Sequence, residues 1–139
     1  MNDYSFEELK KGLTESFDAQ ITEDMLDKFR DLTGDINPLH NDLEYAKEKG
    51  FGSRIVYGML TASLLSTLGG VYLPGKRCLI HSVETNFLKP VFPGDCLTVK
   101  GTVYLVDEEF HQVTLKTEIF KQDGQKVLLG KMKVGVLDE

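Results

Sequence analysis

The pattern of hydrophobic and polar positions changes character partway along the chain. From residue 83 onward apolar residues alternate with polar ones, whereas earlier they recur at helical spacing or in one unbroken run. Alternation is typical of β-strands, because successive side chains of a strand point to opposite faces of the sheet. A weaker alternation over residues 13–21 predicts one early strand. The later alternation predicts four consecutive strands, over residues 83–87, 97–105, 113–119 and 128–136.

Two helices are predicted to follow the early strand. Thr22 is placed to cap the first helix and Gly34 to end it. This helix carries one apolar stripe at spacings i, i+4 and i+7, formed by Met25, Phe29 and Leu32. A second, short helix is predicted over residues 42–50, begun by Asp42 and ended by Gly50.

A central helix is predicted over residues 55–68, which read IVYGMLTASLLSTL and contain no charged residue. A helix without a charged face is expected to be buried on all sides, and Gly69 and Gly70 are expected to stop it. Short connections, including a tight hairpin at Asp123-Gly124, favour an antiparallel sheet. The sequence therefore predicts an α+β domain in which the sheet curls around this helix, with a dimer covering the remaining apolar sides.

Length and charge narrow the range of functions. The chain has 139 residues without a linker, repeat or low-complexity tract, so we expect one domain over residues 1–139. Its 16 Lys and Arg residues against 22 Asp and Glu give a formal charge of −6. Proteins that hold nucleic acid through phosphates normally carry excess basic residues on one face, and here the basic residues are scattered. Nucleic acid is therefore not an expected partner.

The cysteines indicate whether the protein binds a metal, and the N-terminal residues indicate its cellular location. Cys78 and Cys96 form no CxxC pair, and no run of histidines completes a metal site, so we expect free, buried thiols and no metal. Residues 1–11 are polar and charged, and no apolar stretch of about 18 residues could span a bilayer. We expect a soluble, cytoplasmic protein of a reducing compartment with no membrane partner.

The connection between the first two helices carries the densest cluster of candidate chemistry. Turn and capping preferences explain Gly34, Asn37 and Pro38, but they do not explain Asp35 and His40. A carboxylate and an imidazole on either side of a rigid Asn-Pro bend can face one small volume and hold a single water between them. The alternative is that both are solvated turn residues.

Gly58 is a second candidate, in the first turn of the central helix. Helix N-termini expose unpaired N–H groups and partial positive charge, and a glycine lets a substrate carbonyl approach them closely. Gly58 is therefore a candidate oxyanion hole. The alternative is that it only permits close packing against a strand.

An ordered set of motifs in the chain resembles the R-specific enoyl-CoA hydratases, the MaoC-like (hydratase 2) family with a hot-dog fold. The run FRDLTGDINPLH, from Phe29 to His40, resembles the family signature together with Ala46 six positions later. The resemblance continues through residues 55–60 (IVYGML) and 86–95 (NFLKPVFPGD). The chain departs from the pattern at Tyr57, where the family usually has histidine, so Tyr57 either supports the catalytic pair or belongs to the pocket wall.

The resemblance implies roles for the candidate residues. Asp35 and His40 would be the catalytic pair, and Gly58 would supply the N–H of the oxyanion hole. Ser66 is similar to a serine that helps order the site in some members, although its hydroxyl could equally bond back to its own helix. Asn37 is similar to an asparagine that braces the active-site turn.

The implied reaction is addition of water to a trans-2-enoyl-CoA to form an (R)-3-hydroxyacyl-CoA, or its reverse, with no metal or redox cofactor. The resemblance also implies a homodimer. One alternative is dehydration of 3-hydroxyacyl groups on an acyl carrier protein. The net charge of −6 disfavours docking of an acidic carrier, but Lys76, Arg77 and Lys89 could form a local basic patch.

Two further alternatives keep the fold and change the chemistry. A thioesterase would direct water to the thioester carbon, and an acyl-CoA-binding module would have lost the reaction. The sequence leaves the acyl chain length open, because it depends on how residues such as Leu43, Tyr57 and Leu60 shape the pocket.

Overall fold

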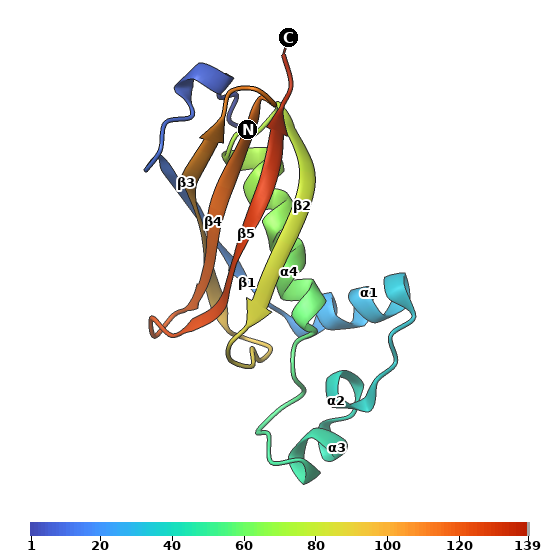
Figure 1. Ribbon diagram of the computed structural model, residues 1–139. Helices are drawn as coiled ribbons and strands as arrows, with labels where there is room; N and C mark the ends of the chain where they lie inside the picture. The colour runs from blue at the N-terminus through green and yellow to red at the C-terminus, as the bar shows by residue number, and fades with distance from the viewer. Residues whose placement is uncertain (139) are drawn as a thin grey trace.

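The computed structural model describes residues 1–138 and contains one five-stranded antiparallel sheet (Figure 1). The strands are β1 (Thr14–Gln20), β2 (Cys78–Phe87), β3 (Cys96–Asp107), β4 (Gln112–Lys121) and β5 (Lys126–Val136), in the order β1-β3-β4-β5-β2. Strands β3, β4 and β5 pair with their neighbours in sequence, whereas β1 and β2 form the two edges. All five predicted strands are confirmed.

Helix α4 (Gly58–Thr67) runs along one face of the sheet, as Figure 1 shows. Inward-facing side chains of the three central strands and of α4 make up most of the core. Gly101 of β3 lies where Leu68 enters this core, because a Cβ there would stand 3.0 Å from the Leu68 Cδ2 atom. The expected arrangement of a sheet curled around a helix is confirmed.

The ends of the central helix differ from those expected. Residues 55–57 precede the helix in non-helical form, because the Ile55 amide donates to the Leu39 carbonyl and the Val56 amide to the Val91 carbonyl. The glycine pair does not stop the helix, which continues as the π-helical segment η2 (Leu68–Tyr72). Contacts distant in sequence therefore override the local pattern at both ends.

Burial on all sides is wrong for α4 within one chain. Met59 is 65% exposed, and Ser63 and Ser66 are also exposed on the same helix. The apolar stripe predicted on the first helix is only partly buried. Phe29 packs against the core, but Leu32 is 84% exposed, and the fully buried residue of this helix is Leu26. Nothing else in residues 1–138 covers these surfaces.

Three helices, α1 (Glu23–Thr33), α2 (Pro38–Asn41) and α3 (Leu43–Glu48), form a segment that projects from one end of the sheet (Figure 1). The predicted caps are confirmed. Thr22 Oγ1 accepts from the Met25 amide at 3.2 Å, and Gly34 ends α1 with φ of 77°. Asp42 caps α3 through the Glu44 and Tyr45 amides. The one-turn helix α2 was not predicted. A short 3-10 helix, η1 (Phe6–Glu8), precedes β1.

Two local predictions about burial are also wrong. Leu105 is 54% exposed because the register of β3 against β4 shifts between Val103 and Leu105, which reverses the side-chain alternation. Both cysteines are free, but Cys96 is exposed and Cys78 only half-buried. Among residues 1–138, no helix is both long and apolar enough to cross a membrane.

Candidate active site

The turn between α1 and α2 is shaped by its own polar side chains. Asn37 Oδ1 accepts from the Leu39 amide at 2.9 Å, which makes Asn37 the cap of α2, and Pro38 occupies the first helical position. Asp35 Oδ1 accepts from the Asn37 amide at 3.1 Å. Asn37 therefore braces the turn. Asp35 is exposed and uses only Oδ1 in this bond, so its Oδ2 atom is available to accept a hydrogen bond.

His40 has a defined orientation on α2. Its Nδ1 lies 2.7 Å from the carbonyl oxygen of Ile55. Because a carbonyl oxygen only accepts, Nδ1 carries the proton of this bond. In the neutral ring Nε2 is then an acceptor, which is the state a general base requires. The non-helical form of residues 55–57 leaves this carbonyl free to accept.

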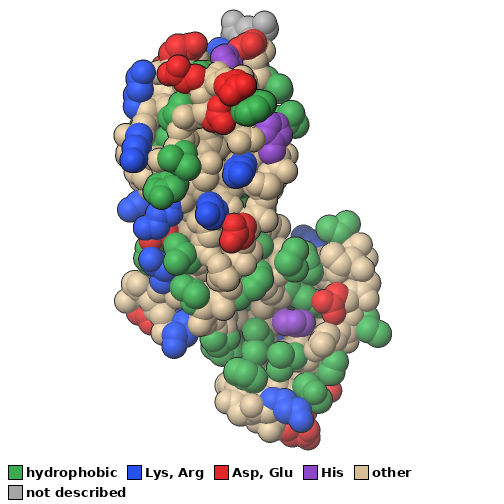
Figure 2. Space-filling model, viewed as in Figure 1, with side chains coloured by type: hydrophobic (Ala, Val, Ile, Leu, Met, Phe, Trp, Pro, Cys, Tyr) green, Lys and Arg blue, Asp and Glu red, His purple; other side chains and the backbone are tan. Residues whose placement is uncertain are grey.

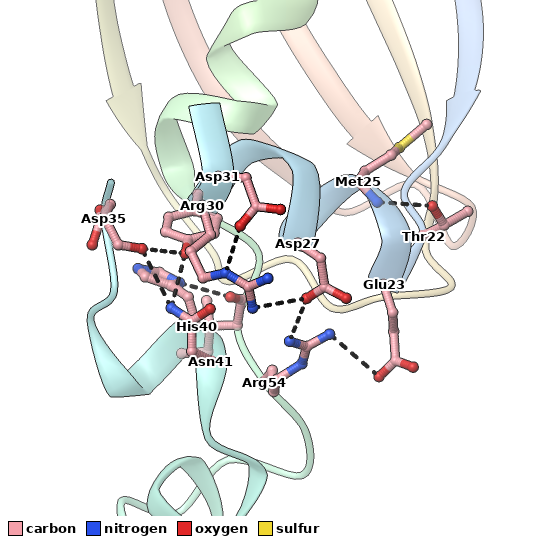
Figure 3. Close-up of polar contacts among 12 residues, drawn as sticks. Thr22, Glu23, Met25, Asp27, Arg30, Asp31, Asp35, His40, Asn41 and Arg54 are labelled. Atoms are coloured by element: carbon pink, nitrogen blue, oxygen red, sulfur yellow. Dashed lines mark hydrogen bonds and ion pairs between the residues drawn. The ribbon is translucent and has the colours of Figure 1, made fainter. Parts of the chain in front are cut away.

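Tyr57 links the two members of the predicted pair. Its hydroxyl donates to the main-chain carbonyl of Asp35 at 2.5 Å and accepts from Asn41 Nδ2 at 2.9 Å. Its ring stacks on His40 with centroids 4.2 Å apart. Figure 3 shows Asp35, His40 and Asn41 side by side within this network. The structure places Tyr57, which is only 2% exposed, behind the pair and not among the residues of the pocket wall.

A cleft of about 360 Å³ opens beside His40. Its walls come from residues 55–56, the start of α4, the end of β2 with the loop that follows it (residues 87–91), and Val127 of β5. His40 and Gly58 both line it, whereas Asp35 and Ser66 do not. The sequence did not mark Phe87, Thr61 and Val127 as lining residues, because Phe87 and Val127 meet through the pairing of β2 with β5 and Thr61 reaches the cleft through the packing of α4 against the sheet.

Gly58 begins α4 and lies against the end of β2. A Cβ atom there would stand 3.1 Å from Cε1 of Phe87, so the glycine permits a close approach. No side chain caps this helix end. The Leu60 and Thr61 amides donate to the Tyr57 carbonyl, while no acceptor faces the Gly58 amide among residues 1–138. The geometry therefore agrees with both interpretations of Gly58. The glycine permits close packing against β2, and its N–H is available as a hydrogen-bond donor in the cleft.

Ser66 lies apart from the other candidates. It is eight residues beyond Gly58, which is about 12 Å along a helix, and its side chain is exposed. Within one chain, the structure brings His40 and Gly58 to the cleft with Asp35 next to them, and leaves Ser66 outside.

The basic residues considered as one patch are separated. Lys89 lines the cleft, but Lys76 and Arg77 precede the other end of β2, and Arg77 Nε pairs with Asp3 at 2.8 Å. Figure 2 shows Lys and Arg side chains scattered over the sheet, with hydrophobic side chains gathered near the junction with the helical segment. Within residues 1–138, no group of three or more His, Cys, Asp or Glu side chains could hold a metal ion.

Asp95 holds the loop that leads from the cleft into β3. It accepts from the Phe92 amide at 2.8 Å and from Gln122 Nε2 at 3.0 Å, and it pairs with Lys121 at 3.2 Å. Burial pushes the pKa of Asp95 upward, but these hydrogen bonds and the Lys121 charge outweigh it, so the pKa lies below its ordinary value.

The curled antiparallel sheet around a single helix is a hot-dog fold, and solved structures with the same fold superimpose closely. An R-hydratase from Pseudomonas aeruginosa, unliganded, has a TM-score of 0.90 at 31% identity, covering 96% of this chain and 86% of that one. An (R)-hydratase from A. caviae involved in PHA biosynthesis has a TM-score of 0.89 at 35% identity, covering 93% and 98%.

The chain belongs to the MaoC like domain family, which it matches over residues 6–125. An (R)-specific enoyl-CoA hydratase from Aeromonas caviae is 41% identical over 106 residues, covering 76% of this chain and 79% of that protein. A 3-hydroxybutyryl-CoA dehydratase from Methylorubrum extorquens is 40% identical over 98 residues, covering 70% of this chain. The match spans only 62% of that dehydratase's own length.

Proposed function

We propose that this protein is an enzyme, an (R)-specific hydratase that adds water to trans-2-enoyl-CoA or catalyses the reverse dehydration. The observation that carries the proposal is the meeting of His40 and Gly58 in one cleft, with the Asp35 turn bound to Tyr57 next to them. Relatives named as (R)-specific enoyl-CoA hydratases at 35% and 41% identity support the same chemistry.

Asp35 and His40 hold the reacting water in this proposal. The Ile55 carbonyl keeps the proton of His40 on Nδ1, so Nε2 takes a proton from the water as its oxygen bonds to C3 of the enoyl group. The C2–C3 π electrons move toward the thioester carbonyl. The pair then returns one proton to C2, and the net change is addition of one water molecule. Because the pair acts from one side of the substrate, the product has one configuration at C3.

Gly58 stabilises the charge that develops during this step. Negative charge gathers on the thioester oxygen as the enolate forms, and in this proposal the Gly58 N–H at the start of α4 donates a hydrogen bond to it. Removal of a single oxyanion donor in other enzymes costs about 3–4 kcal/mol in transition-state stabilisation. Asn37 takes a supporting role by capping α2, whereas Ser66 is exposed and lies outside the cleft of a single chain.

The proposal includes a homodimer formed from single MaoC-like domains. Edge strand β2 exposes apolar side chains, with Leu79 50%, Val83 48% and Phe87 50% exposed, and Met59 is exposed on α4. Covering such a surface with a second copy removes apolar area from water. Light scattering on the sample used for kinetics should give twice the chain mass. The free thiols of Cys78 and Cys96 agree with a cytoplasmic location.

A carrier-protein substrate is the second candidate. A tomato mitochondrial protein named as a 3-hydroxyacyl-[acyl-carrier-protein] dehydratase is 34% identical over 102 residues. Lys89 at the cleft is a single positive charge that could meet a phosphopantetheine phosphate, but Lys76 and Arg77 lie too far away to extend it. We therefore favour the CoA thioester.

The test follows loss of the enoyl-thioester absorbance with crotonyl-CoA, with product chirality read by an R-specific dehydrogenase. Asp35→Asn and His40→Ala are expected to lower turnover by orders of magnitude while the fold is retained. Matched controls are Asp18→Asn, at an exposed carboxylate bonded to Thr98 on the sheet, and His111→Asn, at a histidine outside the cleft whose positive φ asparagine tolerates. Neither control should change turnover.

The outcomes separate the candidates. Turnover of the enoyl-carrier-protein thioester with none of crotonyl-CoA would shift the assignment to the carrier-protein dehydratase. Release of free thiol would indicate a thioesterase. Full activity in folded Asp35→Asn and His40→Ala would refute the proposed pair.

A further inference from the structure

We propose that Tyr57 is a positioning residue, which fixes the Asp35 turn and the His40 ring relative to each other and to the start of α4. The inference rests on the proposed hydratase function and extends it to a residue that touches neither water nor substrate. The Tyr57 side chain is 2% exposed and does not line the cleft. It therefore acts through the residues that it holds.

The hydroxyl group of Tyr57 ties the turn together through bonds of known direction. The Asp35 carbonyl only accepts, so the single phenol proton is committed to it, at 2.5 Å. Asn41 Nδ2 must then donate to the phenol oxygen, at 2.9 Å. The same Nδ2 donates to the Asn37 carbonyl at 2.9 Å. The Tyr57 hydroxyl therefore holds the Asp35 end of the turn directly and the Asn37 end through Asn41.

The ring of Tyr57 fixes the imidazole. It stacks on His40 at a centroid distance of 4.2 Å and an interplanar angle of 28°, while Phe29 packs against it at 4.8 Å. The Ile55 carbonyl holds the edge of the same imidazole through Nδ1 at 2.7 Å. With a bond at its edge and an aromatic ring against its face, the His40 ring has little freedom to rotate.

The backbone of Tyr57 connects this pair to Gly58. Tyr57 is the residue immediately before α4, and its carbonyl accepts from the Leu60 amide at 3.0 Å and the Thr61 amide at 3.1 Å. A displacement of Tyr57 would therefore move the Asp35 turn, the His40 ring and the Gly58 amide together. Misplacement of reacting groups by about 1 Å can lower a rate by about 100-fold, so such a link bears directly on turnover.

Tyr57→Phe tests the hydroxyl while it keeps the ring and its stack. We expect kcat for crotonyl-CoA to fall by about 10- to 100-fold with KM changed by less than about threefold, since the substrate wall is untouched. Tyr4→Phe is the matched control, because it removes a phenol bonded to Glu15 outside the cleft. Both variants should lose some stability to urea, and only Tyr57→Phe should lose kcat.

A second variant reaches the same hydroxyl from its other partner. Asn41→Leu removes the amide that donates to the phenol oxygen, without adding a charge beside the Asp35 carboxylate. It should show the same selective loss of kcat, and it serves if Tyr57→Phe does not fold. The positioning role would be overturned if kcat were unchanged in either folded variant, whether KM stayed the same or increased.

The wild-type measurement separates this inference from the proposed function. Absence of turnover in the folded wild type would refute the hydratase proposal. Normal turnover in the wild type together with normal turnover in folded Tyr57→Phe would leave the hydratase standing and overturn only the role of Tyr57.

Discussion

A methyl group at Gly58 is the smallest change that tests the start of α4 as an oxyanion site. In Gly58→Ala, the new Cβ would stand 3.1 Å from Cε1 of Phe87 and 3.3 Å from Cδ1 and Cζ. Ordinary carbon contacts lie at about 3.5–4.0 Å, so the phenyl ring must retreat by a few tenths of an ångström. Phe87 is 50% exposed at the end of β2, which leaves it room to do so.

The expected change in stability is small because two effects oppose each other. Crowding a packed position costs about 1 kcal/mol at its mild end, and an exposed ring is the mild case. Replacing glycine by alanine in a helix gains about 0.5–1 kcal/mol. We therefore expect the free energy of unfolding of Gly58→Ala to stay within about 1 kcal/mol of the wild-type value.

Activity should respond much more strongly than stability. Gly58 and Phe87 both line the cleft, so the methyl group and the displaced ring lie where the proposed mechanism brings the thioester carbonyl to the Gly58 amide. Loss of a whole oxyanion donor costs about 100- to 1,000-fold in rate, so a displaced carbonyl should cost about 10- to 100-fold in kcat/KM.

The assay is kcat/KM with crotonyl-CoA together with urea unfolding of the same samples. Gly70→Ala is the matched control, because a Cβ on this glycine in η2 meets no atom within 4 Å. It should keep wild-type activity. Wild-type kcat/KM in folded Gly58→Ala would refute the oxyanion assignment, and loss of folding would refute the stability argument.

Two further predictions concern charge and thiol chemistry. Asp95→Asn should lower the urea midpoint at neutral pH. The pKa of Asp95 is below its ordinary value of 3.8 in the folded chain, so its contribution is present above about pH 4 and is lost as pH falls through the folded pKa. The difference between Asp95→Asn and wild type should therefore shrink between pH 4 and pH 2, and a difference that stays constant would contradict this reasoning. Burial raises the pKa of the Cys78 thiol to about 11, whereas Cys96 is exposed, so maleimide at pH 7 should label Cys96 first. In a Cys96→Ser variant, mass spectrometry that shows Cys78 labelled as fast as Cys96 is in the wild type would contradict this expectation.

Local features of this protein were readable from the sequence. The caps Thr22 and Asp42, the αL glycine Gly34 and the alternation of the strands act within a few residues, so each can be recognised without knowing the fold. The same holds for the Asp35 turn, whose chemistry and motif are contiguous in the chain. The family and the sheet around a helix were accordingly predicted and confirmed.

Predictions failed where a distant segment changed the outcome. Residues 55–57 continue the apolar pattern of the helix, yet they are not helical. The Ile55 and Val56 amides donate instead to the carbonyls of Leu39 and Val91. Leu105 continues an alternating run, but a register shift against β4 turns it outward. Neither partner is close in sequence, so no local pattern could reveal the change.

By itself, the sequence determined the five strands, the caps of two helices, the family and the chemical groups of the candidate site, because these depend on side-chain period and on short contiguous motifs. The tertiary structure alone decided that the pairing of β2 with β5 brings Phe87 and Val127 to the same cleft as His40 and Gly58. It also decided that Tyr57 lies behind His40 and Asp35, a position set by packing between segments 17 to 22 residues apart in sequence. Such contacts depend on how the whole chain packs, so no short-range pattern in the sequence reveals them.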